Sequence, residues 1–123
     1  MKYRLRTRTW CWADLLVLAA YIVLSLILCI PLPARLSSDV AGRYVDARVF
    51  QWNNWWIKTA LLDRLDLDYT QHIYTPSGVS LASHNLNWVS SALSVPLDML
   101  VGPIAAYNLL FLLCFWLSGF GTY

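Results

Sequence analysis

An apolar run near the N-terminus is the feature that most constrains this chain. From Trp12 to Pro31 there are 20 residues, and Asp14 at the start is the only charged one. At about 1.5 Å per residue, a helix over this run would be roughly 30 Å long, which matches the hydrocarbon core of a bilayer. We therefore expect a transmembrane helix over residues 12–31.

A cleaved signal peptide is the alternative for this run, because signal peptides also pair a basic start with an apolar stretch. Here the apolar stretch is long for a signal peptide, and the PLPAR segment (Pro31 to Arg35) offers a poor small-residue cleavage site. The sequence favours an uncleaved anchor.

The distribution of charge predicts the orientation of that anchor. Four basic residues lie within the first ten, whereas residues 32–85 carry five basic residues balanced by five aspartates. By the positive-inside rule, the basic segment 1–11 is expected in the cytoplasm and the loop 32–85 on the outer face. The net charge of +2 therefore belongs to a membrane flank, and no nucleic-acid partner is expected.

Two more apolar segments follow the loop. Residues 102–123 carry no charge, and Asn108 is their most polar side chain, so a second long transmembrane helix is expected there. Residues 86–101 are only 16 in number and include Pro96 and Asp98, which predicts a short, kinked helix that is re-entrant, interfacial or strained across the membrane. The fold class is thus all-α and integral to the membrane.

The outer loop itself contains a predicted amphipathic helix. Apolar residues recur at helical spacing from about residue 45 to residue 65. Trp52, Trp55 and Trp56 fall within five residues of this segment, and tryptophans beside a membrane commonly lie at the headgroup level. We expect these three side chains to anchor the helix at the interface, with lipid as a partner.

The polar side chains of the loop are the candidates for chemistry. Asp46 and Asn53 recur on the other side of the predicted helix, where they could serve a site or simply be solvated. Between the helix and the next apolar segment, His72 and His84 flank a turn predicted over residues 75–78. The two histidines are 12 residues apart without a spaced acidic partner, so they are candidates for substrate binding rather than for a metal site.

Three segments carry a resemblance to a known family. They are DARVFQWNNWW (Asp46 to Trp56), IYTPSGVSLASHNLNWVSSALSVPL (Ile73 to Leu97) and AAYNLLFLLCFWLSGFGTY (Ala105 to Tyr123). In order and content they resemble the N-terminal part of bacterial polytopic glycosyltransferases of the GT-C superfamily, which are mannosyltransferase-like and use dolichyl- or polyprenyl-phosphate sugars. Such enzymes transfer a sugar from the lipid carrier to an acceptor on the outer face of the membrane. The resemblance thus implies a multi-pass protein of the bacterial cytoplasmic membrane.

The resemblance also implies roles for particular residues. An acid in the first outer loop is the expected general base, and this role falls on Asp46. The alternative for Asp46 is a helix-terminal residue that interacts with the helix dipole or pairs with Arg43. Asp66 and Asp68 resemble a D-x-D element that binds a divalent cation or the carrier phosphate, and the alternative is a solvated loop end. Arg43 and Arg48 are candidate phosphate contacts, and contact with lipid headgroups is their alternative use.

One departure from the family pattern concerns length. GT-C enzymes run to several hundred residues, so this chain resembles only an N-terminal portion, is expected to be inactive alone, and would have the remainder of a polytopic chain as its partner. The alternative function is that of a small non-enzymatic membrane protein or assembly subunit. Asp98, a charged residue in an apolar segment, keeps a transporter fragment open as well. The alternative for Asp98 is an interfacial cap beside Pro96 or a buried acid that is hydrogen-bonded to Ser94.

Overall fold

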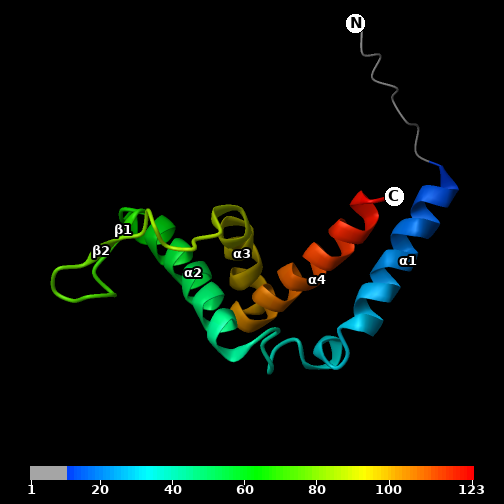
Figure 1. The fold of residues 1–123 in the computed structure, drawn as a ribbon, viewed down its shortest axis with the longest axis horizontal. Helices are drawn as coiled ribbons and strands as arrows, with labels where there is room; N and C mark the ends of the chain where they lie inside the picture. Colours follow the sequence, from blue (N-terminus) through cyan, green and yellow to red (C-terminus); the bar gives the residue numbers. More distant parts are fainter. Residues whose placement is uncertain (1–10) are drawn as a thin grey trace, which may run out of the picture.

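The computed structural model describes residues 11–123, and the basic segment expected in the cytoplasm lies outside this range except for Cys11. Within it the chain is mostly helical, as predicted, with α1 and α2 followed by a small hairpin and then α3 and α4 (Figure 1). The helices are α1 (Trp12–Leu28), α2 (Tyr44–Asp63), α3 (Trp88–Val101) and α4 (Pro103–Gly121), and a 3-10 turn covers Leu32–Arg35. The hairpin strands are β1 (Tyr69–Thr70) and β2 (Val79–Ser80), which the sequence did not predict as strands.

Proline decides where α1 ends. The helix stops at Leu28, before the end of the 20-residue apolar run, because Pro31 and Pro33 lack the N–H group that a helix needs and the chain turns into the 3-10 segment. The resulting helix of 17 residues is shorter than expected. Among the described helices, only α4 is both long and apolar enough to cross a membrane, judged by length and composition.

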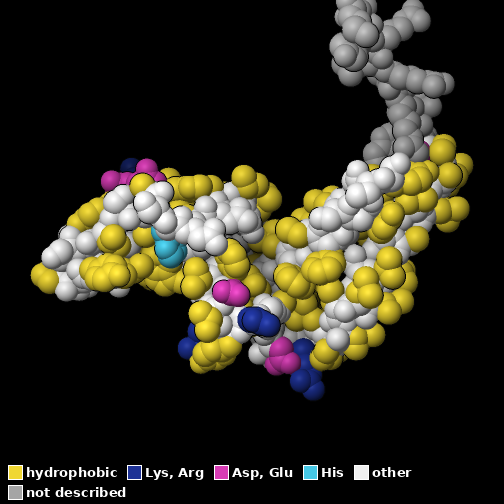
Figure 2. Space-filling view, in the orientation of Figure 1, with side chains coloured by type: hydrophobic (Ala, Val, Ile, Leu, Met, Phe, Trp, Pro, Cys, Tyr) yellow, Lys and Arg dark blue, Asp and Glu magenta, His cyan; other side chains and the backbone are white. Residues whose placement is uncertain are grey.

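Helices α1 and α4 pack side by side and run in opposite directions (Figure 1). Tyr21 near the middle of α1 covers Gly119 near the end of α4, whereas Ser25 and Leu26 near the end of α1 share a groove with Leu109 and Leu112 farther back on α4. The two helices are therefore antiparallel, so that the N-terminal part of one lies beside the C-terminal part of the other. Figure 2 shows that hydrophobic side chains cover most of the outer surface of this pair.

Helices α2 and α4 lie near each other at their N-terminal ends, at the bottom of the view, and diverge from there (Figure 1). Helix α3 packs against both of them. The core beneath α2 is formed by Trp56, Ile57, Ala60 and Leu81, and each side chain is at most 3% exposed. The sequence predicted that Trp56 anchors α2 at the membrane interface, and here the structure differs. Its ring is buried against the protein, because the apolar face of α2 packs on the hairpin and on α3 and not on lipid alone.

An ion pair joins α2 to α3. The ammonium Nζ of Lys58 lies 3.0 Å from Oδ2 of Asp98, and the Asp98 side chain is only 11% exposed. The sequence left Asp98 as an interfacial cap, a partner of Ser94 or a transport residue. The structure gives it an internal partner instead, while the Ser94 hydroxyl donates to the carbonyl of Ser91.

The turn predicted over residues 75–78 connects β1 to β2. The strands are antiparallel, with Tyr69 opposite Ser80 and Thr70 opposite Val79. Gly78 has a φ of 70°, and a Cβ at this position would lie 2.8 Å from the backbone oxygen of Thr70. The turn therefore requires glycine, since any side chain there would be strained and would collide with the backbone.

Candidate functional site

The first turn of α2 presents the acid that the sequence singled out. Asp46 lies in this turn and its side chain is exposed, next to Arg43 at the N-cap. Among the described residues no ion pair joins Asp46 to Arg43, so of the two structural alternatives only the helix-dipole interaction remains. The Asp46 carboxylate is therefore accessible from solvent.

Two residues of α4 hold the loop that leads into this turn. The amide of Asn108 donates to the carbonyls of Leu36 (2.8 Å) and Asp39 (2.6 Å), and its oxygen accepts from the backbone N–H of Ala41 (3.0 Å). The Tyr107 hydroxyl donates to the carbonyl of Ala41 at 3.1 Å. Asn108 is fully buried, so these bonds are shielded from water and fix the start of α2 on α4.

The same loop and the first turns of α2 border an open groove of about 570 Å³. Arg48 lines it, and its guanidinium stacks 3.8 Å from the centre of the Tyr44 ring. Figure 2 shows charged side chains gathered at the bottom of the view, where this loop and the N-terminal end of α2 lie. A guanidinium held over a ring beside a groove can meet a phosphate group as a planar fork.

The D-x-D element lies at the other end of α2. Asp66 and Asp68 follow the C-terminus of the helix, which is 20 residues long and so about 30 Å from end to end. The carboxylate of Asp66 accepts from the N–H of Asp68 at 2.9 Å, as in a turn. The element therefore does not join Asp46 in one site. Within residues 11–123 no group of three or more acidic, histidine or cysteine side chains could hold a metal ion.

The three tryptophans near the middle of α2 and the two histidines that follow the helix in the chain form one aromatic cluster. The rings of Trp52 and Trp56 are stacked with centroids 6.2 Å apart, His72 meets the rings of Trp55 and Trp56 edge-on, and His84 meets Trp52 in the same way. Of the three indoles, Trp55 is the exposed one at 43%. The two histidines thus pack against different tryptophans of α2.

Asn53 is buried within this cluster and is not a solvated polar residue. Its oxygen lies 2.9 Å from Nε2 of His84, and its amide nitrogen donates to the carbonyl of Asn85 at 2.8 Å. Because the amide is oriented by the second bond, Nε2 of His84 carries the proton that it donates to Asn53. The arrangement ties the segment after the hairpin to α2, and it leaves no polar atom of Asn53 for a substrate.

Two contacts that matter for the site were not predicted. Tyr107 was not a candidate, and Asn108 was noted only as a polar residue in an apolar run. The signal was present, since a polar residue within such a helix needs partners, but nothing in the sequence identified the loop 36–41 as the partner.

Comparisons with family models, curated proteins and solved structures gave no match to this chain.

Proposed function

We propose that this chain is the N-terminal portion of a membrane glycosyltransferase that moves a sugar from a polyprenyl-phosphate carrier to an acceptor on the outer face of the bacterial cytoplasmic membrane. The observation that carries the proposal is the exposed carboxylate of Asp46 in the first turn of α2, on a backbone that Asn108 fixes to an apolar helix. Such a group is held near a membrane surface yet is open to a hydroxyl from the aqueous side.

The chemistry requires a base and a leaving group. The Asp46 carboxylate accepts the proton of the acceptor hydroxyl while the hydroxyl oxygen attacks the anomeric carbon of the donor sugar. The bond between that carbon and the phosphate oxygen breaks, and the carrier leaves as polyprenyl phosphate. Arg48 and Arg43, beside the groove and at the N-cap, are the candidates for contact with the phosphate. Asp66 and Asp68 lie beyond the other end of α2 from Asp46, so a divalent cation bound by them would not belong to the same site as the base.

Contacts among the three resembling segments support the proposal. Asn53 in the first segment bonds to His84 and Asn85 in the second, and Asn54 accepts from the Ser91 hydroxyl at 2.9 Å. The third segment holds, through Asn108, the loop 36–41 that leads into the first segment. Residues that are far apart in the sequence thus form one unit around α2, which is what a shared functional role for these segments requires.

The test is sugar transfer in membranes that contain the product of the whole reading frame. Asp46→Asn should abolish transfer of radiolabelled sugar from a polyprenyl-phosphate donor, because the amide cannot take up the proton. Asp63→Asn is the matched control, since Asp63 is exposed at the opposite end of the same helix. The 123-residue chain alone should show no transfer.

The other outcomes are equally informative. Full activity in Asp46→Asn would move the base to another acid, with Asp66 and Asp68 the next to test. If the whole product transfers no sugar at all, the chain is better described as a non-enzymatic membrane protein or assembly subunit.

A further inference from the structure

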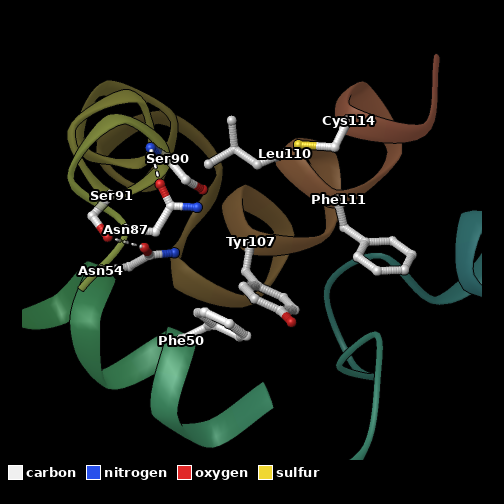
Figure 3. A pocket seen from close by; sticks show the side chains of 9 residues that line it. All are labelled: Phe50, Asn54, Asn87, Ser90, Ser91, Tyr107, Leu110, Phe111 and Cys114. Carbon is white, nitrogen blue, oxygen red and sulfur yellow. Dashed lines mark hydrogen bonds between the residues drawn. The ribbon is translucent and has the colours of Figure 1, made fainter. Parts of the chain in front are cut away.

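A pocket between α2, α3 and α4 has its amide groups on the α2 and α3 side and mostly apolar side chains on the α4 side, and Phe50 of α2 and Tyr107 of α4 also line it. Asn54, Asn87 and Ser90 lie on the α2 and α3 side, and Leu110, Phe111 and Cys114 lie on α4 (Figure 3). The volume is about 200 Å³, and none of the lining residues carries a charge. The space is below the roughly 300 Å³ of a typical small-molecule site, so it suits one head group and not a whole ligand.

The two carboxamides are oriented by bonds to the protein. The oxygen of Asn87 accepts from the backbone N–H of Ser90 at 3.3 Å, as the N-cap of α3, and the oxygen of Asn54 accepts from the Ser91 hydroxyl. Both amide nitrogens therefore face away from these partners. In Figure 3 they point toward the wall formed by α4, and neither donates a hydrogen bond within residues 11–123. Among the described residues both amide nitrogens are therefore left open to a ligand, although Asn87 itself is exposed.

We propose that this pocket binds an uncharged amphiphile whose oxygen acceptors meet Asn54 and Asn87 while its apolar chain lies along Leu110 and Phe111. An anion is disfavoured, because no cationic side chain lines the pocket to offset the loss of its hydration. Ester carbonyls of a diacylglycerol and ring or hydroxyl oxygens of an alkyl glycoside share the required chemistry. The proposal does not depend on the catalytic role of Asp46, which does not line the pocket.

Cys114 supplies a reporter for this pocket, because it is exposed and lines the apolar wall. The full chain, with Cys11→Ser and Cys29→Ser, is placed in nanodiscs of ether-linked phosphatidylcholine, which lacks ester carbonyls. The rate of Cys114 alkylation by N-ethylmaleimide is measured with dioleoylglycerol in one arm and octyl glucoside in the other, and hexadecane serves as the oxygen-free control. Loss of alkylation with either oxygen-bearing probe, and not with hexadecane, supports the proposal and identifies the source of the acceptor.

Two variants test the donors. Asn87→Asp keeps an N-cap acceptor for Ser90 but replaces the amide nitrogen with oxygen, and Asn54→Asp keeps the acceptor for Ser91 in the same way. Each should raise the half-protecting concentration of the effective probe about tenfold, as expected for one lost hydrogen bond. Asn85→Asp adds the same charge at an exposed position outside the pocket and should leave it unchanged.

Three results would overturn the proposal. They are equal protection by hexadecane, no protection by either oxygen-bearing probe, and unchanged protection in both aspartate variants. Circular dichroism of each variant shows whether the helices are retained, and if Asn87→Asp does not fold, Asn54→Asp alone decides.

Discussion

Asn108 is the most polar side chain of an otherwise apolar segment, and both of its amide hydrogens and its oxygen are bonded to the backbone of residues 36–41. Replacement by an apolar residue would leave two carbonyls and one N–H without partners in a buried place. The sequence marked this residue as unusual but could not name its partners, which are 67 to 72 positions away. Periodicity reports only on neighbours along a helix, and these bonds depend on how the loop folds back.

The first prediction concerns this residue. Asn108→Leu should lower the free energy of unfolding by about 3 kcal/mol, because buried backbone groups lose their bonds. Ser118→Leu, at an exposed position of the same helix, should have little effect. Both are measured by tryptophan fluorescence during SDS-induced unfolding of the reconstituted chain. Equal stability of the two variants would mean that water replaces Asn108.

The Lys58 and Asp98 pair leads to a second prediction. Lys58→Met should destabilise the fold by roughly 2 kcal/mol, because it leaves the carboxylate of Asp98 largely buried without a counter-charge. The double variant Lys58→Met with Asp98→Leu should regain most of the loss, since neither charge is then present. The same unfolding assay measures each variant.

The pair of Arg35 and Asp39 is the matched control. Its atoms are 3.1 Å apart, but its side chains are 60% and 49% exposed, so Arg35→Met should cost less than about 1 kcal/mol. A comparable loss in both single variants would show that burial of Asp98 does not determine the effect.

At the scale of elements, the sequence predicted most helices closely. The amphipathic helix expected over about 45–65 is α2 (Tyr44–Asp63), and the short segment 86–101 contains α3 with Pro96 inside it. The sequence was less informative about what each apolar face meets. Trp56 and Trp55 are adjacent, yet one is 2% and the other 43% exposed. Apolar spacing defines a face but does not say whether protein or lipid covers it.

The contact between α1 and α4 gives a prediction at this scale. A Cβ at Gly119 would lie 2.5 Å from Cδ1 of Tyr21, whereas nothing lies within 4 Å of one at Gly121. Gly119→Leu should therefore push the helices apart and cost about 2 kcal/mol, as overpacking does, while Gly121→Leu should be neutral. Spin labels on α1 and α4 measure the separation by electron paramagnetic resonance. Adding Tyr21→Ala should restore it, and a separation unchanged by Gly119→Leu would contradict the packing.

At the scale of the whole molecule, charge and apolar surface are segregated. Hydrophobic side chains cover α1 and α4, and charged ones gather near the two ends of α2 (Figure 2). Large apolar side chains such as Trp12 (84%), Leu16 (71%) and Leu28 (66%) are exposed along α1. A surface of this kind is costly in water and favourable in lipid, which is the physical support for placing the α1 and α4 pair in a membrane.

The antiparallel packing of α1 and α4 predicts on which side of the membrane the C-terminal end lies. If the basic segment 1–11 is cytoplasmic and both helices cross, then Thr122 returns to the cytoplasm while Asp46 stays outside. Single cysteines at Asp46 and Thr122, in a background without Cys11, Cys29 and Cys114, are treated in intact cells with a membrane-impermeant maleimide. The reagent should label the cysteine at position 46 in intact cells and the cysteine at position 122 only after permeabilisation. Labelling of both positions from outside would mean that α4 does not cross the membrane. Labelling of position 122 alone would mean that the anchor is inverted, and Asp46 would then lie on the wrong face for sugar transfer at the cell surface.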